Sequence, residues 1–357
     1  MDDQQDATRA LRRSRAANGP GNDRQYRDII VIGGSAGALD AMLDIAGAFS
    51  EEFPGNIFLV SHLGANRSHL PELLTSAGSL PARHPEDGEP IQAGIIYIAP
   101  PDRHMMVESG RIRLSRGPRQ HFTRPAIDPL FRSAAELFGP RVIGVVLSGT
   151  GNDGTAGLET IQRAGGTTVI QQPTDALYPE MPQSAAAALQ IDQVCTRAEL
   201  PTLLRRLSTE TVAMKAPPVT STNIDELERP AALTCPECGG ALREVTGTAA
   251  KQYRCHTGHS FGAEEVLDGQ TDEVDHALGV ALRVLNERIE LCRQMAEHAR
   301  AGRRPLGITH WNRLRSEAEE QFRVLQQFLA RPATCVILEK AEGALDLAKG
   351  TPERTEA

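Results

Sequence analysis

Residues 28–42 read DIIVIGGSAGALDAM: a short apolar run, a glycine-rich turn and then a helical pattern. Four further apolar runs follow, in NIFLVSH, GIIYIAP, RVIGVVLSG and TTVIQQ, and stretches of helical sequence separate them. Near-continuous apolar strands that alternate with helices are typical of a parallel sheet covered on both faces. We therefore predict an α/β fold, a doubly wound and mainly parallel sheet, over residues 28–207.

The rest of the chain divides by composition. We expect a polar, disordered leader over residues 1–27 and a linker rich in Pro, Ser and Thr over 208–230. A zinc-ribbon-like module is predicted over 231–265. A helical tail is predicted over 266–350, where two stretches with helical periodicity flank RRPLG and favour a helical hairpin.

Charge and hydropathy exclude several functions. The formal net charge is −8, so the overall field does not attract nucleic acid or anionic lipid. No apolar run reaches the roughly 18 residues that span a bilayer, and the polar N-terminus is no signal peptide. Six cysteines are too few for a disulfide scaffold in 357 residues. We expect a cytoplasmic protein without a nucleic-acid partner and without direct membrane insertion.

The glycine-rich turn in residues 33–37 carries a candidate nucleophile. Its sequence, GGSAG, is a G-x-S-x-G elbow between a strand and a helix. In such an elbow the glycines permit a sharp turn that exposes Ser35, and the helix N-terminus offers N–H groups to an oxyanion. The alternative is a plain glycine-rich turn that holds a phosphate. The spacing does not fit the G-x-G-x-x-G dinucleotide fingerprint.

Two further polar residues end predicted strands. His62 follows NIFLVS and can act as the base that a serine nucleophile needs. Asp153 follows RVIGVVLSG and can accept from His Nδ1–H. The alternatives are a structural histidine and a helix N-cap, and His104, after GIIYIAP, is the rival base. Because the carboxyl ends of parallel strands share one edge, we expect Ser35, His62 and Asp153 to form a triad.

Several blocks together are similar to a known family. IGGSAGALDAM, VSHLGANRSHLPELL, FTRPAIDPLFRSAA, GVVLSGTGNDGTAGL and QQPTDALYPEMPQSA resemble, in order and spacing, the catalytic domain of the CheB-type chemotaxis protein-glutamate methylesterases. The resemblance covers about residues 28–200. It implies a serine carboxylic-ester hydrolase in which Ser35 is the nucleophile, His62 the base and Asp153 the residue that orients it. Its implied reaction is hydrolysis of glutamate methyl esters on receptor helices, often with deamidation of glutamine.

The site around the triad is expected to bind an oxyanion and an acidic partner. Backbone N–H groups near Ala36 and in the turn from Thr150 to Asn152 are candidates for the oxyanion site. Arg124 is the candidate for substrate binding, in an arginine-rich segment that could dock carboxylate-rich receptor helices or could be a solvated loop. The family commonly has Met where this chain has Thr150. No cofactor is expected for catalysis.

Partners follow from the same resemblance. We expect a methyl-accepting receptor or a related signalling protein as the substrate. Residues 1–27 are too short and polar to pack as a receiver domain, so regulation would come from a separate receiver protein or from a partner of the tail. The alternative function is a non-catalytic signalling adaptor that binds receptor or kinase helices through the zinc module and helical tail.

A cysteine-rich segment predicts a structural metal site. Cys235-x2-Cys238 is followed by Cys255-x3-His259, and two such knuckles fit a tetrahedral Cys3His zinc ribbon. His256 is an alternative fourth ligand. The segment has little apolar content, so it needs a metal to fold. Protein ligands would fill all four positions, so we expect the zinc to be structural and the module to be dispensable for cleavage of a small ester.

Overall fold

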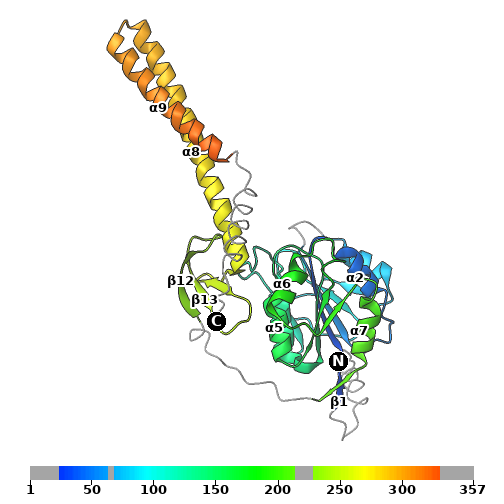
Figure 1. Cartoon of the computed structure of the whole chain (residues 1–357). Helices are drawn as coiled ribbons and strands as arrows, with labels where there is room; N and C mark the ends of the chain where they lie inside the picture. The colour runs from blue at the N-terminus through cyan, green and yellow to red at the C-terminus, as the bar shows by residue number, and fades with distance from the viewer. Residues whose placement is uncertain (1–23, 63–67, 214–227, 330–357) are drawn as a thin grey trace, which may run out of the picture. The chain divides into compact units, whose positions relative to one another are not determined.

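A seven-stranded sheet organises the part of the chain that precedes the cysteine-rich segment (Figure 1). The computed structural model describes residues 24–62, 68–213 and 228–329. All neighbouring strands of this sheet run parallel, which confirms the predicted fold class. In spatial order the strands are β10 (Gln193–Cys195), β9 (Thr167–Gln171), β8 (Val142–Val146), β2 (Ile29–Gly34), β3 (Asn56–Ser61), β5 (Ile96–Ile98) and β4 (Ala82–Arg83).

Helices cover both faces of the sheet and bury two apolar cores. The strands β2, β3, β5, β8 and β9 are buried along their whole length, as a doubly covered sheet requires. One core includes residues of α2 (Leu39–Ala46), α3 (Leu70–Ala77) and α7 (Leu200–Ser208). The other includes residues of α4 (Ile127–Phe138), α5 (Thr155–Arg163) and α6 (Glu180–Ala188).

Two small β structures flank this sheet. The predicted hairpin is present as β6 (His104–Glu108) and β7 (Arg111–Ser115), and it turns at Ser109-Gly110, where both residues have positive φ. A pair that the sequence did not predict joins β1 (Arg24–Tyr26) to β11 (Thr211–Ala213). The end of the expected leader and the start of the expected linker are therefore ordered strands. Residues 1–23 and 214–227 lie outside the described residues.

The cysteine-rich segment folds as a four-stranded antiparallel sheet, which we call the ribbon. Its strands are β12 (Glu228–Thr234), β13 (Ala241–Val245), β14 (Gln252–Cys255) and β15 (Ser260–Gly262). Its core is small: Leu242, Phe261 and Val266 pack with Cys235 and Cys255. So few apolar residues agree with the expectation that this segment needs a metal.

Two long helices follow, α8 (Ala263–Ala301) and α9 (Pro305–Leu329), and the C-terminal unit begins at Leu267, after the first turn of α8. The helices break at Arg303, where φ is positive, and Pro305 opens α9. This agrees with the expected helical hairpin, but α8 begins at once after the ribbon. Residues 330–350 of the predicted tail lie outside the described residues. In the described part of the chain, no helix is long and apolar enough to cross a membrane.

Candidate active site

Ser35 sits in the turn between β2 and α2, as the elbow motif predicts. Its backbone N–H donates to the carbonyl of Ser148 at 2.9 Å, and the Ala38 N–H donates to the Ser35 carbonyl at 3.2 Å. Gly37 has φ +76°, in the region that favours glycine. Ser148 holds the turn from β8, because its hydroxyl donates to the Ala36 carbonyl at 2.8 Å. Ser35 is half-buried and Ala36 is exposed.

The structure brings His62 and Asp153 together at the same sheet edge. Gly34 pairs with Ser61 in the β2–β3 register, so the residues after each strand, Ser35 and His62, follow adjacent strand ends. His62 Nε2 lies 2.9 Å from Asp153 Oδ2. The sequence argument expected Nδ1 in this contact; with Nε2 bound to Asp153, Nδ1 is the remaining ring nitrogen.

Asp153 also caps a helix, though not the one that follows it. Its carboxylate accepts from the backbone N–H groups of Ile127, at 2.6 Å, and Asp128, at 3.0 Å, in the first turn of α4. Asp128 in turn accepts from the N–H groups of Gly154, at 3.1 Å, and Gly157, at 2.8 Å, in the first turn of α5. Asp153, just before α5, thus lies at the N-terminus of α4, and Asp128 of α4 lies at the N-terminus of α5, where the helix dipole stabilises a carboxylate.

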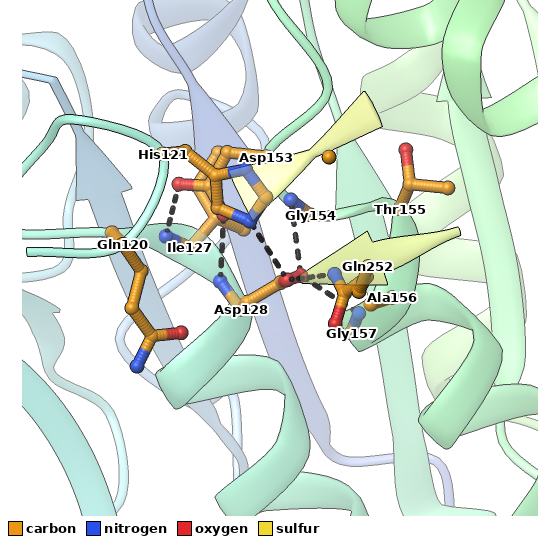
Figure 2. Close-up of polar contacts among 12 residues, drawn as sticks. Gln120, His121, Ile127, Asp128, Asp153, Gly154, Thr155, Ala156, Gly157 and Gln252 are labelled. Atoms are coloured by element: carbon orange, nitrogen blue, oxygen red, sulfur yellow. Dashed lines mark hydrogen bonds and ion pairs between the residues drawn. The ribbon is translucent and has the colours of Figure 1, made fainter. Parts of the chain in front are cut away.

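A buried histidine lies between these two aspartates (Figure 2). His121 Nε2 lies 3.1 Å from Asp128 Oδ2 and 3.8 Å from Asp153 Oδ1, and His121 Nδ1 lies 2.7 Å from Glu265 Oε2. Burial disfavours the imidazolium, but the charges of Glu265 and Asp153 and the hydrogen bonds to Asp128 and Glu265 raise the pKa of His121 well above its usual value. Burial alone would raise the pKa of Asp153, but His121 and the hydrogen bond from His62 lower it.

The rival base, His104, is bound by backbone on both sides of its ring. Nε2 donates to the carbonyl of Pro118 at 2.9 Å, and Nδ1 accepts from the N–H of Ala126 at 3.2 Å. Burial lowers the pKa of His104. Both nitrogens are occupied, so the ring fits a structural role in the loop between β7 and α4.

The residues predicted to bind the oxyanion or the substrate differ in what they contact. Thr150 is exposed, while Asn152 is half-buried and its side chain packs against Gly262 of the ribbon. Arg124 donates to Asp102 Oδ1 at 2.6 and 2.9 Å and to the Gly117 carbonyl at 2.8 Å. Its donors therefore organise the loop rather than face an acidic substrate.

The arginine-rich segment is not a free cationic surface. Acidic side chains lie within 4 Å of Arg113, Arg116, Arg119 and Arg124. Arg111 donates to the Gly88 carbonyl at 2.8 Å. Most of the positive charge that the sequence offered for docking is thus paired within the chain.

The four predicted metal ligands converge in the ribbon. The ligand atoms of Cys235, Cys238, Cys255 and His259 all lie within 4.8 Å of one another. Cys238 and Cys255 Sγ are 3.7 Å apart, and His259 Nδ1 is 3.5 Å from Cys255 Sγ. Zn–S bonds of about 2.3 Å and Zn–N bonds of about 2.0 Å at tetrahedral angles give separations of about 3.8 and 3.5 Å. The separations therefore suit zinc.

His259, not His256, faces the cysteine thiols. Its Nδ1 points to Cys235 and Cys255, while Nε2 lies 3.5 Å from Glu237 Oε2. A carboxylate on the second ring nitrogen is usual for a metal-bound histidine. The His256 ring instead lies against Gly240.

Sequence reasoning missed three members of the buried cluster. Asp128 and His121 are not among the predicted site residues, although an Asp in a first helical turn is a recognisable signal. Glu265 accepts from the N–H of Gly262 at 2.8 Å, three residues earlier, which is half of a capping box. That spacing could have marked the start of α8, but not its contact with His121.

Comparison with known proteins gives a consistent result. The CheB methylesterase family model matches residues 30–204. A Leptospira interrogans serovar copenhageni protein named "Putative protein-glutamate methylesterase/protein-glutamine glutaminase" is 36% identical over 182 residues, which are 50% of this chain and 94% of that protein. The protein-glutamate methylesterase/protein-glutamine glutaminase of Maricaulis maris is 35% identical over 185 residues, 50% of this chain and 46% of that protein.

Among solved structures, the CheB methylesterase catalytic domain of Thermotoga maritima matches with a TM-score of 0.48 and 30% identity, over 50% of this chain and 98% of that one. The family model matches the part of the chain that contains the elbow, His62 and Asp153. The chain belongs to the CheB methylesterase family of hydrolases.

Proposed function

We propose that this chain hydrolyses glutamate methyl esters on a methyl-accepting receptor or a related signalling protein, with Ser35, His62 and Asp153 as its catalytic triad. The 2.9 Å contact between His62 Nε2 and Asp153 Oδ2, beside the Ser35 elbow, carries the proposal. The names of the relatives, protein-glutamate methylesterase/protein-glutamine glutaminase, supply the substrate class. A purely non-catalytic adaptor is not favoured, because such a role gives no reason for this contact.

In the proposed reaction, Ser35 Oγ attacks the ester carbonyl carbon and its proton moves to His62 Nδ1. Asp153 accepts from Nε2–H and stabilises the imidazolium that forms. Backbone N–H groups near Ala36 and in the turn from Thr150 to Asn152 would stabilise the oxyanion. Collapse of the tetrahedral intermediate breaks the ester C–O bond, and the proton on Nδ1 leaves with methanol.

A second half-reaction would restore the enzyme. His62 takes a proton from water, whose oxygen attacks the acyl-Ser35 carbonyl, and the proton returns to Ser35 Oγ as glutamate is released. Glutamine would follow the same route with ammonia as the leaving group. No metal takes part in these steps. The zinc that we propose for the ribbon would be held by Cys235, Cys238, Cys255 and His259 and would stabilise the ribbon's fold.

Ser35→Ala tests the proposal. We expect methanol release from methylated receptor membranes to fall by a factor on the order of 10⁴–10⁶, as for the loss of a triad nucleophile. Ser148→Ala is unsuitable as a control because Ser148 holds the elbow, whereas Ser76→Ala changes an exposed serine in α3. Activity of Ser35→Ala within tenfold of the Ser76→Ala protein would exclude the triad.

A further inference from the structure

Four charged side chains meet in one buried cluster that includes the aspartate of the proposed triad. Figure 2 shows three of them, His121, Asp128 and Asp153, and the fourth is Glu265. The side chains of His121, Asp128 and Asp153 are each at most 2% exposed, and that of Glu265 is 10% exposed. Three of them belong to the catalytic domain. Glu265 lies 144 positions from His121 in the sequence, in the first turn of α8, directly after the ribbon.

The hydrogen bonds fix the charge of the histidine. Both of its ring nitrogens contact carboxylate oxygens, Nδ1 on Glu265 and Nε2 on Asp128. An ionised carboxylate only accepts, so when both carboxylates are ionised both nitrogens donate and the ring is an imidazolium, in agreement with the raised pKa of His121. Without that positive charge, the repulsion between the neighbouring buried carboxylates of Asp128 and Asp153 would be unbalanced.

The ribbon holds the same histidine by its backbone and its neighbours. The His121 N–H donates to the Ser260 carbonyl at 2.8 Å, and the ring centroids of Phe122 and Phe261 are 4.8 Å apart. Both His121 and Phe122 have positive φ, a strained state that persists only when surrounding contacts hold it. Gln252 of β14 adds a hydrogen bond to Asp128 at 3.3 Å.

We propose that His121 is a positioning residue that keeps Asp153 ionised and directed at His62, and that the ribbon and the first turn of α8 complete the active site by supplying Glu265 to His121. The inference rests on the proposed triad. It assigns the C-terminal module a part in the chemistry of the catalytic domain, separate from any docking of receptors.

The charges around Asp153 give a signed expectation. Asp153 lies within 4 Å of His62 and His121, and the charge of Asp153 also acts on His104. His121 in turn contacts Asp128 of α4 and Glu265 of α8, and Arg132 of α4 lies 3.4 Å from Asp128. Replacing His121 with a neutral residue makes this set more negative by one charge. The added negative charge favours protonation of His62, so the acidic limb of the pH profile of kcat/KM should move to higher pH.

The experiment uses the full chain and a short peptide that carries a glutamate γ-methyl ester, with methanol release as the readout. His121→Asn is chosen because Asn tolerates positive φ. We expect kcat/KM near neutral pH to fall between about ten- and a hundredfold, as for misplaced catalytic groups, with the acidic limb moved to higher pH. In His121→Asn/Glu265→Gln the original net charge returns, so the limb should move back toward that of the wild type.

Glu265→Gln alone, nearly isosteric, keeps the test independent of any folding defect in His121→Asn. We expect kcat to fall at least tenfold with KM within threefold, while Glu264→Gln, an exposed neighbour in the same helical turn, matches the wild type. Circular dichroism and thermal unfolding verify that each variant folds. Glu265→Gln with the kcat of Glu264→Gln would overturn the inference.

Ser35→Ala assayed on the same peptide separates the two proposals. If Ser35→Ala is inactive and the His121 and Glu265 variants retain full activity, the triad stands and the positioning role is wrong. If Ser35→Ala retains activity, the proposed function fails and the inference fails with it.

Discussion

The two histidines near the strand ends differ in what their ring nitrogens contact. His62 contacts Asp153 through Nε2, whereas His104 is bonded to backbone groups through both nitrogens. We expect His62→Gln to lower kcat/KM by a factor on the order of 10⁴ or more, because a triad base is lost. His104→Gln should stay within tenfold of wild type and unfold at a lower temperature, because it loses buried hydrogen bonds. The reverse pattern of activities would assign the base to His104.

The raised pKa of His121 predicts how stability depends on pH. A group whose pKa is higher in the folded than in the unfolded state stabilises the fold fully below its unfolded pKa, near 6.5. That contribution is lost as pH rises through the folded pKa, which lies well above the usual value. We expect the thermal unfolding temperature of wild type to fall between pH 7 and pH 10 more steeply than that of His121→Asn.

Asp153 affects the pH dependence of stability with the opposite sign. Its pKa is lowered in the folded state, so its contribution is present above the unfolded pKa, near 3.9, and is lost only as pH falls through the lower folded value. The additional loss of stability that we expect for the wild type, relative to His121→Asn, at alkaline pH therefore does not come from Asp153. Parallel curves for the two proteins above pH 7 would contradict a charged His121.

At the scale of elements, the turn after β8 approaches the elbow after β2 closely. A Cβ atom on Gly149 would lie 2.2 Å from Met181 Sδ and 2.8 Å from Ser35 Cβ. We expect Gly149→Ala to displace the elbow and to lower kcat/KM by about a hundredfold, with a lower unfolding temperature from overpacking. Gly279→Ala is the matched control, because nothing lies within 4 Å of its added methyl group. Equal kinetics for the two variants would show that the elbow tolerates displacement.

The sequence predicted the strands of the large sheet that are buried along their whole length and missed β1, β4, β10 and the helix α7. The five apolar runs correspond to β2, β3, β5, β8 and β9 because burial on both faces makes a strand apolar throughout. β4 has two residues, β1 has three, and β10 contains the exposed Val194, so none carries a readable period. Their pairing depends on tertiary contacts. α7 could have been predicted from the buried Leu200, Leu204 and Leu207, which share one face.

The residues of the candidate site also fall into those that the sequence predicted and those that it did not. Ser35 and His62 could be proposed because each directly follows a recognisable strand, and Asp153 because it lies in the turn after β8, and parallel strands end at one edge. The contact of His121 with Glu265 could not, because sequence distance carries no signal of a salt bridge formed across two modules. The sequence also predicted the wrong ring nitrogen of His62, Nδ1 in place of Nε2, for the contact with Asp153. Which nitrogen makes this contact depends on the rotation of the side chain, which the sequence does not specify.

At the scale of the whole molecule, the ribbon should bind one zinc ion per chain. We expect elemental analysis of protein purified without chelator to give about one zinc, and Cys235→Ser/Cys238→Ser to abolish it. The sequence alone suggested that this change would spare cleavage of a small ester. Because the ribbon contacts His121 and precedes Glu265, we now expect that activity to fall as well, by at least tenfold.

The control for this prediction is Cys195→Ser/Cys292→Ser, which changes two buried thiols outside the metal cluster. It should keep the zinc and the activity. A zinc content near zero in the wild type would refute the metal site. Full activity in zinc-free Cys235→Ser/Cys238→Ser would refute the dependence of catalysis on the ribbon.

The pairing of β1 with β11 has an evolutionary consequence. It fixes the entry of the chain into the catalytic domain, at Arg24, beside its exit, at Ala213. Termini that lie side by side permit circular permutation and insertion into other proteins. A sensor or output module that a gene rearrangement attaches before Arg24 or after Ala213 would therefore lie at the same place on the domain.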